Sequence, residues 1–116
     1  MKKINILKNN RDFDRIIKNN TPFKTKYYII YKERTDLFNY HFGISVSKKI
    51  GNAVTRNLYK RRIRSIIDKN NYQNNFNCII IVGKGINERS FIEMKQNLLI
   101  AFNNLNILKE NSNEEK

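Results

Sequence analysis

The sequence predicts a two-layer α+β domain in which helices pack on a small mixed sheet. Its 116 residues fit a single domain, and 40% of them are hydrophobic, which is enough for a core. Segments with strand and helix patterns follow in the order helix, strand, strand, helix, strand, helix. Because no repeat or linker interrupts the chain, we expect one domain over residues 1–110 and a frayed tail over 111–116.

The first helix is predicted over residues 11–18. Asn9 or Asn10 precedes it, and either side chain can cap the first turn. Hydrophobic residues recur at helical spacing, so the helix has one apolar face. This face carries Phe13, Ile16 and Ile17.

Two strands are expected next, over residues 26–32 and 40–47. The first is rich in aromatic and β-branched residues, and the second alternates apolar with polar side chains. Since only the loop 33–39 separates them, we expect the two strands to pair as a hairpin. Alternation places Tyr28 and Tyr31 on opposite faces of the first strand but leaves open which face is buried.

The second half of the chain adds a helix, a strand and a helix. The helix is predicted over residues 53–68, with Asn52 as its cap. Residues 78–82 form a continuous apolar run, typical of a strand buried on both faces, and the strand–helix–strand unit could join parallel strands. Ser90 and Glu93 form a capping box at the start of the last helix. Its apolar side is expected to consist of Ile92, Leu98, Leu99 and Phe102.

The most densely charged segment runs from Lys48 to Arg64. It contains seven basic residues, and no acidic residue occurs between Asp36 and Asp68. On a helical wheel its polar side forms one arc opposite an apolar back. The arc consists of Arg56, Asn57, Lys60, Arg61 and Arg64. Because like charges one turn apart destabilise an isolated helix, the pattern favours an anionic partner over a solvated face that happens to be basic.

The whole chain is strongly basic, with a formal net charge of +13. This charge favours a polyanion, either a nucleic acid or a membrane surface. No segment is apolar enough to span a bilayer and the N-terminus lacks the apolar region of a secretory signal, so we expect a cytoplasmic protein with no membrane partner. The single cysteine, Cys78, lies in an apolar run and is expected to be a buried hydrophobe.

Residues that could carry catalysis are few. His41 is the only histidine, Asp12 and Asp14 do not face each other on a helix, and the glycines of residues 83–85 lack the spacing of a phosphate loop. No pair of acids suggests a two-metal nuclease. The residues therefore indicate an RNA or DNA binder that has no small-molecule substrate and is not an enzyme in its own right.

The string SVSKKIGNAVTRN, followed by KRRIR, resembles the signature of the protein subunit of bacterial ribonuclease P. The likeness covers most of the chain, including the first helix, the aromatic strand and the late apolar strand. Members of that family have an α+β fold with a left-handed strand–helix–strand crossover. The resemblance therefore implies a left-handed connection here, although right-handed ones dominate in general.

The resemblance also implies a role beside a catalytic RNA, which uses Mg²⁺ to remove the 5′ leader from precursor tRNA. The protein would contribute no catalytic or metal-binding residue. The residues expected to bind RNA are Lys48, Lys49, Asn52, Arg56, Asn57, Lys60, Arg61, Arg62 and Arg64. A cleft between the sheet and the first helix would hold the single-stranded leader, and its expected residues are Phe13, Ile17, Tyr31 and Ser45.

Two positions depart from the family pattern. Leu58 stands where the pattern has a second arginine, and Arg62 is a candidate to replace it. Ile17 stands where an aromatic residue of the cleft is usual, which weakens stacking but keeps an apolar contact. Composition and charge fit a structural RNA-binding protein equally well, for example one associated with the ribosome, whereas the scarcity of acids disfavours an independent nuclease.

Overall fold

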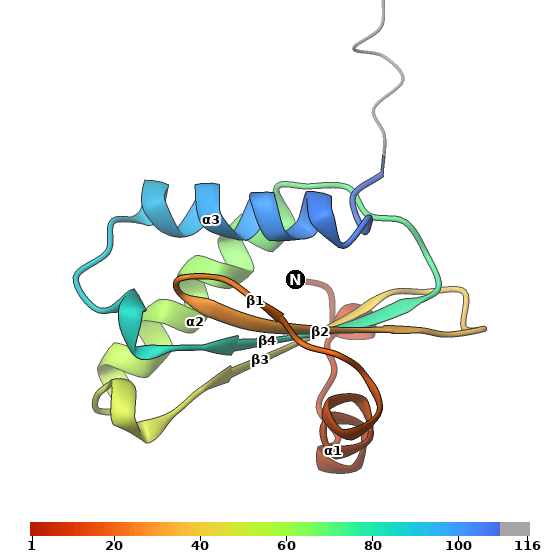
Figure 1. Cartoon of the computed structure of the whole chain (residues 1–116), viewed down its shortest axis with the longest axis horizontal. Helices are drawn as coiled ribbons and strands as arrows, with labels where there is room; N and C mark the ends of the chain where they lie inside the picture. The colour runs from red at the N-terminus through yellow and green to blue at the C-terminus, as the bar shows by residue number, and fades with distance from the viewer. Residues whose placement is uncertain (110–116) are drawn as a thin grey trace, which may run out of the picture.

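A four-stranded sheet lies at the centre of the computed structural model, which describes residues 1–109. Helices α2 (Ala53–Asp68) and α3 (Phe91–Asn104) pack on one face of the sheet, and α1 (Asn10–Asn19) lies on the other (Figure 1). The α+β class and the predicted order of elements are confirmed, and α1 adds a partial third layer. The expected tail over 111–116 lies outside the described residues. Three short 3-10 helices complete the fold: η1 (Lys3–Asn5), η2 (Lys48–Ile50) and η3 (Lys84–Ile86).

The strands lie side by side in the order β1-β2-β4-β3. Strand β4 pairs antiparallel with β2 and parallel with β3. The strand bounds are Phe23–Lys24 for β1, Tyr28–Arg34 for β2, His41–Val46 for β3 and Phe76–Val82 for β4. The sequence had not predicted β1, which forms a short hairpin with β2.

The predicted hairpin between residues 26–32 and 40–47 is wrong, because β4 lies between β2 and β3. Nearly every residue of β4 is buried, so this strand needs a neighbour on each side and helices on both faces. Strand β3 alternates apolar and polar residues and can therefore occupy the edge. Nearness in the sequence favoured the hairpin, but burial of the apolar strand determined the order.

Side-chain caps define the starts of the three α-helices. The Oδ1 atom of Asn9 accepts from the N–H of Arg11 at 2.8 Å, which selects Asn9 over Asn10 as the first cap. Asn52 accepts from the N–H of Thr55 at 2.9 Å, and α2 has the predicted bounds. The predicted capping box precedes α3. Helix α2 joins the parallel strands β3 and β4, and the left hand of this crossover stays a prediction from the resemblance.

The main core lies between the sheet and the pair α2 and α3. Tyr28 points into this core, so Tyr31 lies on the α1 face of the sheet. Cys78 is fully buried, as predicted, and burial raises the pKa of its thiol. Ile92 is 64% exposed, so its expected place on the apolar side of α3 is wrong. Met94 takes that place, since it lies one turn before the buried Leu98.

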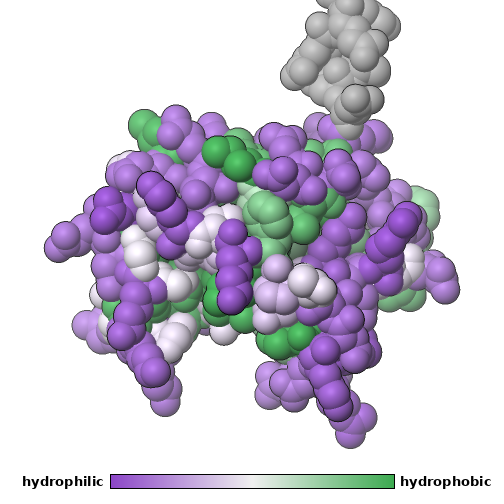
Figure 2. Space-filling model, viewed as in Figure 1, coloured by the Kyte–Doolittle hydropathy of each residue, from purple (hydrophilic) through white to green (hydrophobic). Residues whose placement is uncertain are grey.

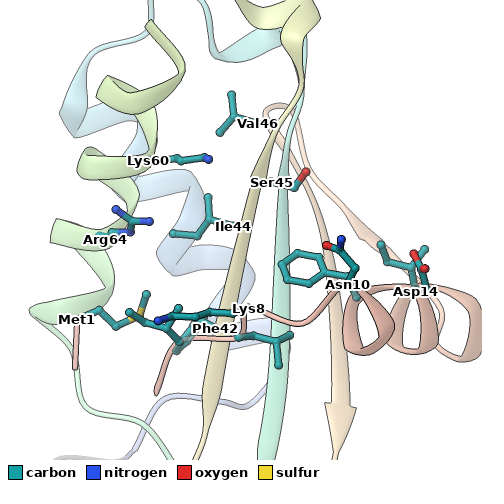
Figure 3. Close-up of a pocket in the computed structure, with 14 residues that line it drawn as sticks. Met1, Lys8, Asn10, Asp14, Phe42, Ile44, Ser45, Val46, Lys60 and Arg64 are labelled. Carbon is teal, nitrogen blue, oxygen red and sulfur yellow. The ribbon is translucent and has the colours of Figure 1, made fainter. Parts of the chain in front are cut away.

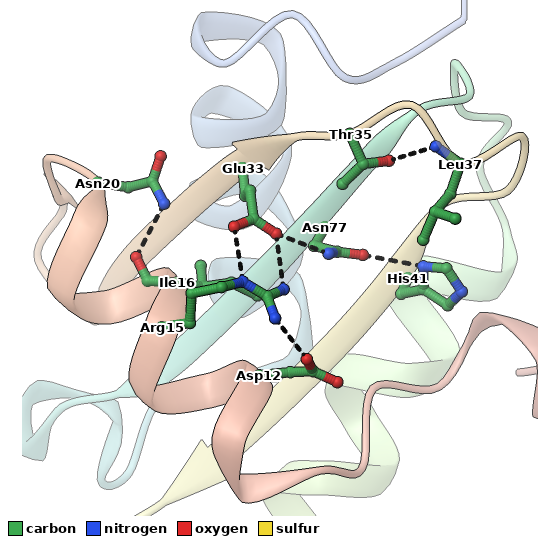
Figure 4. A network of polar contacts seen from close by, with 9 residues as sticks. All are labelled: Asp12, Arg15, Ile16, Asn20, Glu33, Thr35, Leu37, His41 and Asn77. Atoms are coloured by element: carbon green, nitrogen blue, oxygen red, sulfur yellow. Dashed lines mark hydrogen bonds and ion pairs between the residues drawn. The ribbon is translucent and has the colours of Figure 1, made fainter.

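Helix α1 is held on the opposite face by apolar burial and by a polar network. Ile16 of α1 and Ile79 of β4 are both fully buried on this side of the sheet. Arg15 donates to both carboxylate oxygens of Glu33, at 3.1 and 3.0 Å, and to Asp12 at 2.6 Å (Figure 4). These contacts fix the position of α1 on the sheet.

Asn77 extends this network to His41. Its Nδ2 atom donates to Glu33 at 2.9 Å, which leaves Oδ1 to accept from the Nδ1–H of His41 at 2.8 Å (Figure 4). The hydrogen bonds from Arg15, assisted by that from Asn77, lower the pKa of the Glu33 carboxyl. The histidine thus has a structural partner.

Candidate nucleic-acid interface

A cavity of about 760 Å³ opens along the outer edge of β3. It extends from α2 on one side of the strand to α1 on the other, and the N-terminal segment lies at one end (Figure 3). Polar and charged side chains cover most of the protein face seen in Figure 2, with apolar side chains visible between them. The cavity brings both kinds together: its lining from α1 is Asn10, Phe13, Asp14 and Ile17, and that from β3 is Phe42, Ile44, Ser45 and Val46.

Strand β3 borders the cavity because it is an outermost strand of the sheet. The N–H of Leu7 donates to the carbonyl of Phe42 at 2.8 Å, so the N-terminal segment covers the start of the free edge. Further along the strand, Ile44 and Ser45 face the cavity from opposite sides of the sheet. An open edge of this kind gives an extended chain access to both faces of one strand.

The α2 side of the cavity is cationic. Lys60 and Arg64 are one turn apart and extend from α2 toward β3 (Figure 3). Among residues 1–109, neither they nor the other cations of the segment 48–64 form an ion pair with a carboxylate. Asp68, at the end of α2, pairs instead with the amino group of Met1 at 2.7 Å. Such an unneutralised surface attracts a polyanion.

The nine residues expected to bind RNA fall into two groups. Lys60 and Arg64 line the cavity, and the others lie outside its lining. The exposed members of the outer group are Lys48, Lys49, Asn52, Asn57 and Arg61, and the half-buried ones are Arg56 and Arg62. The Oδ1 atom of Asn52 is used in capping α2. Leu58 is half-buried, and Arg62 lies one turn after it on the same helix.

Three of the four residues expected in the leader cleft line this cavity, namely Phe13, Ile17 and Ser45. Tyr31 does not line it. This residue lies on β2 opposite Ile79 of β4, so β4 and β3 separate it from the open edge. Tyr31 therefore lies on the α1 face of the sheet, but the cavity lies farther toward β3.

The N-terminal segment is one part of the cavity that the sequence did not predict. Met1, Ile6, Leu7 and Lys8 all contribute to its lining. This segment is short and has no helical or strand periodicity, so no pattern indicated where it would lie. The nearest signal was the presence of apolar and basic residues just before the cap of the first helix.

In the described part of the chain, no three His, Cys, Asp or Glu side chains come together as they would to hold a metal ion. None of the helices there is long and apolar enough to cross a membrane. The cavity offers the cations of Lys8, Lys60 and Arg64 against the single carboxylate of Asp14, together with apolar side chains, an amide and a hydroxyl. Fold and site together define a small basic α+β protein with a groove suited to an extended polyanion.

Residues 1–106 match the Ribonuclease P protein family. The chain belongs to this family, and its fold and basic motif agree with that assignment. A Ribonuclease P protein component from Streptococcus pneumoniae (strain CGSP14) is 37% identical over 118 residues, which cover 100% of this chain and 96% of that protein. Membership makes the chain part of a ribonuclease P complex, which processes tRNA, and implies an RNA partner.

Solved structures show the same fold. The RNase P protein of Staphylococcus aureus superposes with a TM-score of 0.82 at 27% identity, over 90% of this chain and 98% of that one. The RNase P protein of Thermotoga maritima gives a TM-score of 0.75 at 26% identity, over 82% of this chain and 92% of that one. The sheet and helices described above are therefore shared by relatives from different bacteria.

Proposed function

We propose that the chain is the RNA-binding, non-catalytic subunit that assists a catalytic RNA in removing the 5′ leader from precursor tRNA. The observation that carries the proposal is the composition of the cavity at the β3 edge. Cations line it from α2, and apolar side chains line it from α1 and β3, together with Asn10, Asp14 and Ser45. A single-stranded RNA has a charged backbone and apolar base faces, so it can contact both sides at once.

The two sides of the cavity have separate roles in this proposal. Lys60 and Arg64 neutralise leader phosphates, while Phe13 and Ile17 contact its bases. Stacking of a base on an aromatic ring is worth about 1–3 kcal/mol, so Phe13 contributes more than Ile17. Ser45 supplies a hydroxyl that can donate to or accept from a base edge.

The basic residues outside the cavity are proposed to bind the catalytic RNA. No carboxylate among residues 1–109 is paired with them, so they can contact phosphates without first breaking an ion pair. If about five phosphates are contacted, the logarithm of the binding constant should fall with the logarithm of salt concentration with a slope of about −4. This group consists of Lys48, Lys49, Arg56, Arg61 and Arg62, with Asn52 and Asn57 as neutral neighbours.

Hydrolysis is assigned to the RNA partner, whose bound Mg²⁺ supplies the metal-ion chemistry. The residues of this chain neutralise phosphates and position the leader, which lowers the Mg²⁺ concentration that the RNA requires. No residue is assigned a catalytic or metal-binding role. The proposal places this work in the cytoplasm, with precursor tRNA as the substrate and neither a membrane nor a small molecule as a partner.

A reconstitution experiment tests the proposal. The purified protein is mixed with ribonuclease P RNA and precursor tRNA at low Mg²⁺, and 5′ cleavage is measured. We expect the protein to stimulate cleavage by the RNA. Binding without stimulation would indicate a structural RNA-binding protein with no part in cleavage, and cleavage without the RNA would indicate an independent nuclease.

A further inference from the structure

Gly43 lies within β3 and is paired with Ile79 of β4, on the face of the sheet that α1 covers. Ser45, two residues further, lies on the same face and lines the cavity. A Cβ atom added at Gly43 would overlap Cζ of Phe13 and would lie 3.0 and 3.1 Å from Cε1 and Cε2 of that ring. The tip of the Phe13 ring therefore occupies the place of a side chain on β3.

The need for glycine at this position comes from the ring and not from the backbone. The φ angle of Gly43 lies outside the left-handed region, so alanine would fit its backbone conformation. The three atoms nearest to the added Cβ all belong to Phe13. Glycine weakens a strand interior and often marks a close approach, and here the approaching group is this ring.

Helix α1 cannot easily withdraw to make room for a larger residue. Ile16 is fully buried, and Arg15 makes two hydrogen bonds to Glu33 on strand β2. The Phe13 side chain, in contrast, is half-buried and borders open space in the cavity. A methyl group at Gly43 should therefore turn the ring and leave the helix in place.

We propose that Gly43 is a positioning residue of the leader cleft. It allows the Phe13 ring to lie with its tip against β3, beside Ser45, and so sets the depth at which a base can stack. This inference rests on the proposed function, because it takes the leader as the ligand. It predicts that Gly43 acts on leader binding through Phe13.

The test uses the complex reconstituted with ribonuclease P RNA and measures leader discrimination, the ratio of the affinities for precursor tRNA and mature tRNA. Phe13→Ala should lower this ratio by roughly five- to twentyfold, and Gly43→Ala by roughly three- to tenfold. The double variant Phe13→Ala and Gly43→Ala should have the same ratio as Phe13→Ala within about twofold, because the ring that the added methyl group would displace is absent. Gly83→Ala is the control, since its added Cβ would lie 3.4 Å from the nearest atom, the Tyr27 carbonyl oxygen.

A second readout is unfolding of the free protein by urea. Gly43→Ala should destabilise the wild-type chain but not the Phe13→Ala chain, in which the vacated space accepts the methyl group. If Phe13→Ala leaves discrimination unchanged, the leader cleft is wrong and the role of Gly43 falls with it. The role of Gly43 is overturned, and the leader cleft is kept, if Phe13→Ala lowers discrimination but Gly43→Ala does not. The same conclusion follows if the two effects multiply in the double variant.

Discussion

The two sides of the β3 edge differ in whether their cationic side chains are paired with carboxylates. On the α1 side, Arg15 is bonded to both Glu33 and Asp12. On the α2 side, Lys60 and Arg64 have no carboxylate partner within residues 1–109. The paired charges hold a helix on the sheet, whereas the unpaired charges are available to a polyanion. Substitutions on the two sides should therefore separate stability from affinity.

Charge reversal on the α2 side should have the largest effect. The double substitution Lys60→Glu and Arg64→Glu should cost about 2–4 kcal/mol in binding of precursor tRNA to the complex, because two charge-assisted contacts become repulsive. The loss should be smaller for mature tRNA, which has no leader. Filter binding at several salt concentrations would measure both affinities and the reduced salt dependence.

The matched control reverses two exposed lysines outside the cavity, Lys24→Glu and Lys95→Glu. It has the same change in net charge and should leave the preference for leader-bearing substrate intact. An equal loss for precursor and mature tRNA in the cavity variant would contradict the leader role of Lys60 and Arg64.

Removal of the carboxylate on the α1 side should affect stability instead. Glu33→Ala leaves the buried Asn77 without an acceptor for its Nδ2 and releases Arg15. We expect a loss of about 1–2 kcal/mol in the free energy of unfolding, measured with urea. Binding of the catalytic RNA to the outer basic residues should change little. A large loss of that binding at unchanged stability would show that the two sides are not separable.

Substitutions of Asn52 should have smaller effects, and they test both stability and RNA affinity, because this side chain caps α2 within the basic region. Asn52→Ala should lower the free energy of unfolding by about 1 kcal/mol. Asn52→Asp keeps the cap but adds a negative charge, so stability should be retained while RNA affinity falls. Equal RNA affinity for wild type and Asn52→Asp would remove Asn52 from the proposed interface.

The smallest effect is expected on the free energy of unfolding when the pH is lowered. Arg15 lowers the pKa of Glu33 in the folded state, so this pair contributes stability that is fully present above the unfolded pKa of about 4.3 and is lost as the pH falls through the folded pKa. Solvent screens the partly exposed pair and keeps the effect small. Urea unfolding between pH 6 and pH 3 should show a steeper decline for wild type than for Glu33→Gln. Parallel declines would mean that Glu33 does not contribute.

Much of the site could be predicted because its residues follow local rules. The cap at Asn52 and the helical spacing of Lys60 and Arg64 depend on residues a few positions apart, and both predictions agree with the structure. The hairpin prediction failed for the opposite reason. It treated residues 26–32 and 40–47 as neighbours because they are close in the chain, whereas the apolar strand β4 lies between them.

Local chemistry in the sequence was sufficient to predict the helices, their caps, the strand segments and the basic motif. Long-range pairing was needed to place β3 at the edge of the sheet, to turn Tyr31 toward α1 and to bring Phe13 and Lys60 to one cavity. The physical reason is that the alternation of side chains along one strand does not specify which strand pairs with it or which of its two faces is buried. Which face is covered depends on helices that lie far away in the chain.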